Sequence, residues 1–369
     1  MKLTLLSQNL QKKISLVNHA ISSRSPLPIL SNFLLEAAAG KLRILATDLE
    51  IGLQVDVAAN IEEEGSVAIP AKLFYELIQS FPEEKITISL EKETLLVKGK
   101  NIQSSFQTNP KDEFPKLYEE AGEKIATFTT SDLKNAISQV VFAASLDTTR
   151  AALSGILVKR EENGFLLVAT DGYRLSLKHH SVKESREEVT LLIPARVFKE
   201  LLQFLEQDKI VELYVAKASN QVMFVQEETV LVGRLIEATF PNYEKIIPTD
   251  FSTKAIFDLG EMQKAVKISS LFARESANIV KFSLEKETIR ISAATPSLGE
   301  NIVTVEAKIT GEENQIAFNA KYLLDLFSNI TSDTIVFEMN GPVNPGVFKI
   351  ENDPSFLHII MPIRVQQEG

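Results

Sequence analysis

The chain has 369 residues, of which 44% are apolar and 24% charged, with no Cys and a net charge of −10. This composition is typical of a soluble globular protein of two or three domains, and it excludes disulfide-stapled and thiolate-dependent proteins. No apolar run approaches the roughly 18 residues of a membrane span, and the N-terminal apolar run is too short for a signal peptide, so we expect a cytoplasmic protein with no membrane partner. If the charge is evenly spread, it also argues against nucleic-acid binding.

Periodicity in the first third of the chain predicts two helices among short strands. Residues 7–22 place Leu10, Ile14, Val17 and Ile21 on one helical face, with Ser7 as the expected N-cap. A second helix is expected at 71–81, directly after Pro70. Alternating and β-branched residues predict strands at 2–5, 32–37, 41–47, 51–59, 66–69, 85–91, 93–99 and 102–107. The order is therefore two successive β-α-β-β-β halves.

Two landmarks recur along the chain. The sequence Ala-Thr-Asp at 46–48 returns at 169–171, and a fainter echo at 294–299 has Pro296 in place of the Asp. Residues 69–78 and 193–202 are identical at six of ten positions, and 318–327 forms a third copy. Two landmarks at nearly constant offsets indicate domain triplication. We therefore predict an α+β protein of three tandem copies, with boundaries at 1–123, 124–248 and 249–369.

The predicted helices carry a different charge balance from the rest of the chain. They span 7–22, 71–81, 131–145, 195–207, 260–275 and 319–329. Helix 131–145 is expected to bury Leu133, Ile137, Val140 and Val141, and helix 260–275 to bury Met262, Val266 and Leu271. Together the helices hold ten Lys or Arg against seven Asp or Glu. Helices that all face one way would form a basic face opposite an acidic outer surface, although any amphipathic helix has a charged solvent face.

An enzyme is the rival interpretation, with Asp48 and Asp171 as catalytic or metal-binding carboxylates at strand ends. The third copy lacks this Asp, and Asp-Gly is a common turn dipeptide, which favours a turn. The His179-His180 pair has no second ligand pair nearby, and no Gly-rich phosphate loop occurs. We therefore expect no catalytic residue, no metal and no cofactor. A repeat scaffold that does not bind DNA is the other alternative.

Taken together, the motifs resemble a known family. They are Leu-Pro-Ile-Leu at 27–30, Ala-Thr-Asp-Leu-Glu at 46–50, Ala-Thr-Asp-Gly at 169–172, Phe-Pro-Asn-Tyr at 240–243 and Met-Pro at 361–362. In this order they resemble the bacterial sliding clamp, the beta subunit of DNA polymerase III, over essentially the whole chain. The resemblance implies a non-catalytic processivity factor. It also implies a head-to-tail homodimer whose six domains would form a ring around double-stranded DNA, with helices lining the hole and sheets outside.

The resemblance also implies partners and sites. The partners are the replicative polymerase catalytic subunit, a clamp loader, and other polymerases and repair proteins, which dock through short peptides. The dimer interface would hold Phe106, Leu271 and Phe272, and the DNA-facing cations would be Arg24, Lys72, Arg150 and Arg196.

A peptide-binding groove is implied between the second and third domains, with Tyr173 and Arg174 projecting from a turn that Gly172 permits. Its lining would be Leu153, Thr170, Gly172, Tyr173, Arg174, Leu175, Pro241, Lys245, Ile246, Ile359, Ile360, Met361, Pro362, Ile363, Arg364 and Val365. The chain departs from the family's frequent residues at Tyr173, often His, and at Lys245, often Arg. Ala151 and Ala152 replace aromatic residues, which argues against base stacking there.

Overall fold

The computed structural model describes residues 1–22, 27–118, 122–162, 164–181, 189–295 and 299–364. Contacts between residues divide the chain into two compact units. Unit 1 comprises Met1–Leu133 and Arg196–Leu235, and unit 2 comprises Lys134–Ala195 and Ile236–Gly369. The division passes through the second copy, so each unit holds one whole copy and one half of the second.

The predicted order of elements is confirmed in all three copies. The first copy contains β1 (Lys2–Leu6), α1 (Ser7–Val17), β2 (Asn32–Ala38), β3 (Lys41–Thr47), β4 (Ile51–Ala58), β5 (Asn60–Glu63), β6 (Gly65–Pro70), α2 (Ala71–Ser80), β7 (Lys85–Glu91), β8 (Thr94–Lys98) and β9 (Gln103–Gln107). Short β5 is the one strand beyond two β-α-β-β-β halves.

The second and third copies repeat this order. The second contains β10 (Glu123–Thr129), α3 (Thr130–Val141), α4 (Ala151–Ser154), β11 (Gly155–Glu161), β12 (Gly164–Thr170), β13 (Arg174–Ser181), β14 (Thr190–Pro194), α5 (Ala195–Phe204), β15 (Ile210–Ala216), β16 (Gln221–Gln226) and β17 (Thr229–Arg234). The third contains β18 (Thr253–Asp258), α6 (Leu259–Ala273), β19 (Ile279–Glu285), β20 (Thr288–Thr295), β21 (Gly299–Gly311), β22 (Asn314–Asn319), α7 (Ala320–Asn329), β23 (Thr334–Met339), β24 (Gly346–Ile350) and β25 (Asp353–Ile360).

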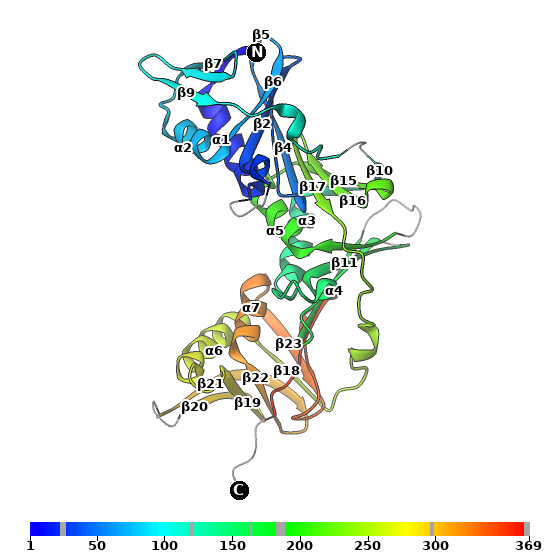
Figure 1. The fold of residues 1–369 in the computed structure, drawn as a ribbon. Coiled ribbons are helices and arrows are strands. Elements are labelled where there is room, and N and C mark those ends of the chain that lie inside the picture. The colour runs from blue at the N-terminus through cyan, green and yellow to red at the C-terminus, as the bar shows by residue number, and fades with distance from the viewer. Residues whose placement is uncertain (23–26, 119–121, 163, 182–188, 296–298, 365–369) are drawn as a thin grey trace. The chain divides into compact units, whose positions relative to one another are not determined.

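All named strand pairs are antiparallel, and the sheets run across the copies. Unit 1 holds a five-stranded sheet in the order β5-β1-β7-β8-β9 and an eight-stranded sheet in the order β10-β15-β16-β17-β4-β3-β2-β6. Unit 2 holds a twelve-stranded sheet in the order β14-β11-β12-β13-β25-β24-β23-β18-β21-β20-β19-β22. In the third copy, α6 and α7 lie side by side against the strands (Figure 1). The helices thus form one layer over the sheet and bury their apolar face there.

The first helix is shorter than its apolar periodicity predicts. α1 ends at Val17 and a short 3-10 turn follows, so Ile21 lies beyond the helix and is only half-buried. The expected N-cap is also wrong, since Leu6 occupies that position without a side-chain cap. The Ser7 hydroxyl instead donates to the Pro82 carbonyl at 2.6 Å and accepts from the Glu84 N–H at 3.0 Å. A tertiary contact with the second half of the copy has replaced the local cap.

Most of the side chains predicted to be buried on the other helices are buried in the structure. α3 buries Leu133, Ile137, Val140 and Val141, and α6 buries Met262 and Val266. The expectation for Leu271 is wrong, because this side chain is 49% exposed on α6. No helix in the described part of the chain is long and apolar enough to cross a membrane.

Candidate functional site

A tight turn follows β3 in the first copy. Thr47 donates its hydroxyl to the Ile51 carbonyl at 2.8 Å, and Asp48 Oδ1 accepts from the N–H groups of Glu50 and Ile51 at 3.0 and 2.9 Å. The Leu49 N–H donates to Thr47 Oγ1 at 3.0 Å. The polar side chains at this strand end are therefore used by the turn itself.

The second copy builds the same turn after β12. Thr170 donates to the Arg174 carbonyl at 2.6 Å, and Asp171 Oδ1 accepts from the N–H groups of Tyr173 and Arg174 at 2.9 and 3.0 Å. The Gly172 N–H donates to Thr170 Oγ1 at 3.1 Å. The turn interpretation of both Asp residues is confirmed. Within the described residues, no group of three or more His, Asp or Glu could hold a metal ion.

Each turn lies where two copies join. In what we call the first joint, β4 pairs with β17, and the Arg234 N–H donates to the Glu50 carbonyl at 3.0 Å. In the second joint, β13 pairs with β25, and the Met361 N–H donates to the Tyr173 carbonyl at 2.8 Å. Glu50 therefore corresponds to Tyr173, and Arg234 corresponds to Met361. The two joints share one backbone design.

A linker covers the sheet at each joint. Phe114 and Leu117 pack on Leu34, Leu45, Met223 and Val232 at the first joint. At the second joint, Phe240, Tyr243 and Ile247 pack on a cluster that includes Leu157, Val168, Leu175, Leu177 and Ile359. A cavity of about 490 Å³ lies along this second linker, and Pro241 is the one predicted groove residue that lines it.

The second joint brings together the two principal segments of the predicted groove. Thr170–Leu175 lies beside 359–361 through the β13–β25 pairing, and the Ile363 N–H continues the contact by donating to the Ala317 carbonyl at 2.8 Å. Tyr173 projects with 57% of its surface exposed, as predicted. Other predicted members with exposed surface are Gly172, Pro241, Lys245, Ile246, Met361 and Arg364, and those half-buried are Leu153, Pro362 and Ile363. Val365 lies outside the described residues.

Apart from Arg174, four of the predicted groove residues that the structure describes are buried. Leu175 and Ile359 belong to the core cluster under the linker, while Ile360 and Thr170 are also buried. Their side chains hold the two strands together beneath the surface, which agrees with the alternative that some members are strand-core residues. They support the groove from below.

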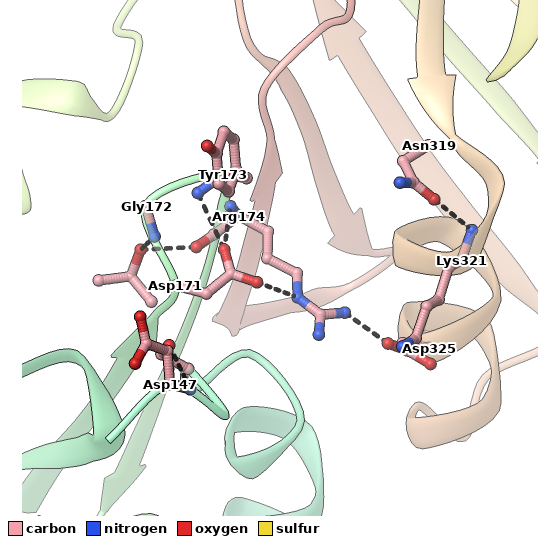
Figure 2. Close-up of polar contacts among 10 residues, drawn as sticks. Asp147, Asp171, Gly172, Tyr173, Arg174, Asn319, Lys321 and Asp325 are labelled. Atoms are coloured by element: carbon pink, nitrogen blue, oxygen red, sulfur yellow. Dashed lines mark hydrogen bonds and ion pairs between the residues drawn. The ribbon is translucent and has the colours of Figure 1, made fainter. Parts of the chain in front are cut away.

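Arg174 corrects the expectation that it projects freely. Only 8% of this side chain is exposed, and it donates to Asp171 Oδ2 at 3.1 Å and to Asp325 Oδ2 at 2.7 Å. Figure 2 shows the guanidinium reaching from the turn to α7. Its carbon lies 4.6 Å from the Tyr322 ring centre and 5.6 Å from that of Phe142. Charge pairing and stacking make Arg174 a buried clamp.

Further polar side chains are buried near Arg174. His358 is fully buried 5.3 Å from the Phe142 ring centre, and neither ring nitrogen has a hydrogen-bond partner in the described structure. Burial, and secondly the charge of Arg174, hold the pKa of His358 well below its usual value of 6.5. Ser176 donates to the Gln139 carbonyl at 2.5 Å, and Gln139 Oε1 is also buried without a partner there. Burial likewise raises the pKa of Tyr322, with Asp171 adding to the effect.

These contributions from α3, β25 and α7 were missed from the sequence. A signal was present, because the third landmark, Asn319-Ala320-Lys321, repeats Pro194-Ala195-Arg196. The meaning of this repeat comes from the structure, in which Arg196 at the first joint pairs with the turn residue Asp48 and so places the equivalent helix beside the turn. Asn319 caps α7 by accepting from the Lys321 N–H at 2.9 Å. Lys321 is exposed on the same helix as Asp325, the partner of Arg174 (Figure 2).

The predicted DNA-facing cations lie in different settings. Lys72 is exposed at the start of α2. Arg150 is exposed and lies 3.8 Å from an Asp147 oxygen. Arg196 is 43% exposed and bonds Asp48 at 2.6 Å, with Glu50 at 3.6 Å. Arg24 lies outside the described residues. The six long helices carry nine Lys or Arg against five Asp or Glu, so their basic surplus holds with the observed helix ends.

The predicted interface residues lie in the first and third copies. Phe106 is buried in β9 and packs edge-to-face on Phe74 with ring centres 5.6 Å apart. Leu271 is exposed on α6, and Phe272 is partly buried against the core of the third copy.

Comparison with known proteins covers almost the whole chain. The family descriptions of the DNA polymerase III beta subunit match with the N-terminal domain at residues 1–118, the central domain at 127–242 and the C-terminal domain at 244–364. The beta sliding clamp of Staphylococcus aureus is 29% identical over 357 residues, which cover 94% of each chain.

Solved structures give the same result. The DNA polymerase sliding clamp of Bacillus subtilis has 28% sequence identity and a TM-score of 0.95, over 99% of this chain and 100% of that one. A sliding clamp of Pseudomonas aeruginosa bound to griselimycin has 25% identity and a TM-score of 0.94, with the same coverage.

Proposed function

This chain belongs to the family of the DNA polymerase III beta subunit, the beta sliding clamps, which are non-catalytic processivity factors, and we propose that it works as a head-to-tail homodimeric ring. The ring encircles double-stranded DNA in the bacterial cytoplasm. It tethers the replicative polymerase catalytic subunit, and other polymerases and repair proteins use the same docking site. As the family resemblance implies, a clamp loader opens and closes the ring. We place the domain boundaries at 1–123, 124–248 and 249–369.

Strand pairing carries the ring proposal. At each joint the last strand of a first half pairs with the last strand of the next copy's second half, β4 with β17 and β13 with β25. The same rule applied a third time pairs β21 with β9. Along its length β9 pairs only with β8 within the described chain, and residues 299–306 of β21 pair only with β20. A second chain would satisfy both edges, and a heterologous interface that closes forms a ring.

Exposed apolar residues support the same third joint. Ile302 is 51% exposed on the part of β21 that pairs with β20 alone, and Leu271 is exposed on the neighbouring helix. Phe106 and its strand β9 would lie opposite them. Burying these side chains between chains removes apolar surface from water, which stabilises an assembly.

The helices suit the lining of a hole that holds DNA. Their basic surplus attracts phosphates without reading bases, which lets a ring slide, while the acidic remainder of the chain discourages binding elsewhere. Arg24, Lys72, Arg150 and Arg196 are the proposed contacts to the duplex. Because Arg196 is engaged by Asp48 and Glu50, we assign it a smaller share than Lys72.

The groove at the second joint is the proposed docking site for partner peptides. Exposed Tyr173 and Met361 lie on adjacent segments joined by a backbone hydrogen bond, over a core held by Leu175 and Ile359. An adaptable Met beside an aromatic ring suits peptides with apolar anchors. The relative's complex with griselimycin supports ligand binding by clamps of this kind.

Retention on circular DNA tests the ring. The protein, loaded on a nicked circular plasmid by a bacterial clamp loader with ATP, should stay bound through gel filtration and be released when the plasmid is linearised. The double variant Leu271→Ala and Phe272→Ala should sediment as a monomer and lose retention. Val343→Ala removes another exposed apolar side chain of the third copy and should keep the dimer. An intact dimer in the double variant, or retention on linear DNA, would refute the proposal.

A further inference from the structure

The first joint contains a pocket at the position equivalent to the groove of the second. It encloses about 360 Å³ between the Thr47–Ile51 turn, the linker residues Lys116 and Leu117, and the end of β17. We infer that this pocket is a second peptide-binding site, of polarity opposite to the groove, which takes an acidic segment of a partner protein. It goes beyond the clamp activity, since the proposed groove lies at the other joint.

Backbone correspondence fixes which residues replace the groove residues. The bond from the Arg234 N–H to the Glu50 carbonyl matches that from the Met361 N–H to the Tyr173 carbonyl. Arg234 therefore stands where the groove has Met361. By the same alignment of the linkers, Phe114-Pro115-Lys116 against Phe240-Pro241-Asn242, Lys116 stands where the second joint has Asn242. Two cations replace an apolar and a neutral residue.

The floor of the pocket is formed by the buried Leu117. Leu117 is buried against β4, where a Cβ on Gly52 would lie only 2.8 Å from its Cδ2 atom. Glycine at this position is what lets the linker seat so close to the strand. Leu117 and Gly52 therefore form a packed base for the pocket, and a base that is already packed lowers the entropic cost of binding.

Charge decides the class of ligand. Lys116 and Arg234 are both exposed, and in the described structure neither makes an ion pair. The acidic residues nearby, Asp48 and Glu50, are engaged by Arg196 at 2.6 and 3.6 Å. Two available cations thus face the ligand, and carboxylates are their complement.

An apolar contact lies beside the two cations. Leu49 is 51% exposed and holds a left-handed φ of 77°, where its counterpart is Gly172. A leucine held exposed in a costly conformation gives the pocket an apolar lip. An apolar lip beside two cations in one small pocket matches a peptide with alternating acidic and apolar residues. A nucleic-acid strand, with a charge on every phosphate, has no aliphatic side chain to cover the exposed Leu49.

A direct binding measurement tests this site. The probe is a fluorescein-labelled eight-residue peptide of alternating aspartate and leucine, followed by anisotropy with the full chain. Arg234→Met combined with Lys116→Asn installs the residues of the second joint and should weaken binding at least about tenfold. Lys281→Asn combined with Lys308→Met makes the same charge change at exposed sites of the third copy and should leave affinity unaltered. A peptide with lysine for aspartate should not bind.

Three outcomes would overturn the inference. They are no saturable binding of the acidic peptide up to about 1 mM, equal binding by the pocket double variant, and displacement of the peptide by duplex DNA, which would make the pocket a nucleic-acid site. Since both substituted side chains are exposed, melting temperatures of the variants should match the parent, and a lowered value would be corrected by measuring binding well below the transition.

Discussion

The two joints share their backbone, and they place polar and apolar groups in opposite layers. Beneath the turn, the second joint buries Gln139, Arg174, Ser176 and His358, whereas the first has Leu16, Ile51, Leu53 and Leu231 at the equivalent positions. Above the turn, the second joint exposes Tyr173 and Met361, and the first exposes Glu50 and Arg234.

The inversion shows how one joint can be specialised without a change of fold. Antiparallel pairing and the Thr-Asp turn need only backbone groups and two side chains, so the remaining positions are free to differ. At the second joint, a buried polar network fixes the turn and α7, and leaves its apolar surface available for a ligand. Such a network is stable only while every charge in it is paired.

The largest contrast should come from the two arginines that hold the turn carboxylates. Arg174→Met removes a buried cation from Asp171 and Asp325, and should lower the free energy of unfolding by about 3 kcal/mol. Arg196→Met removes a 43% exposed partner of Asp48 and should cost about 0–1 kcal/mol. Urea unfolding measures both. Similar losses of unfolding free energy in the two variants would show that the buried network of the second joint stabilises the chain no more than the exposed pair of the first.

The exposed apolar residue of the groove can be replaced by the charged residue of the first joint. Met361→Arg gives the second joint the residue of the first, and the loss of an apolar contact should weaken a polymerase-tail peptide by about 1.5–3 kcal/mol, or 10- to 150-fold. Val343→Arg adds the same charge at another exposed site of the third copy as the control. Deletion of residues 361–369 should abolish binding without unfolding the chain. Peptide affinity that calorimetry finds unchanged after either change would remove the groove from the second joint.

The buried histidine predicts a pH dependence for the second joint. His358 is neutral when folded because its pKa is lowered well below 6.5, so below pH 6.5 the unfolded chain binds a proton that the folded chain does not. Stability should therefore fall with falling pH, by about 1.4 kcal/mol per unit from pH 6.5 to the folded pKa.

His358→Leu, the residue of the first joint, provides the matched variant for that measurement. It should flatten the dependence between pH 6.5 and 5. Asp353, whose pKa is held below 3.8 by Ser355 and Lys178 against the opposing effect of burial, loses its contribution only at lower pH. An unchanged slope in the variant would assign the dependence to other groups.

The smallest contrast concerns the left-handed residue of each turn. Gly172 has a φ of 91° and a Cβ there would meet nothing within 4 Å, so Gly172→Ala should cost only the conformational penalty, about 1 kcal/mol. Leu49→Gly relieves the same penalty but adds chain entropy, and should change stability by about 0.5 kcal/mol or less. Thermal melts measure the stability of both variants. A large loss of stability in Leu49→Gly would show that the Leu49 side chain packs against the protein.

Local sequence determined the repeat, the order of elements and the turns. Apolar periodicity located the six long helices, and the Thr-Asp spacing predicted the turns, because these depend on backbone geometry and on residues close in the chain. The family motifs could be read in the same way, and they led to the sliding clamps.

Only the tertiary structure decided what each similar residue does. Arg174 is buried because α7, about 150 residues away, supplies Asp325, and Leu271 is exposed because no described element covers that part of α6. Ser7 bonds the second half of its copy instead of capping its helix, and Arg196 faces a turn of the preceding copy. Burial and charge pairing are set by segments far apart in sequence, and the strand pairing at the joints is what brings them together.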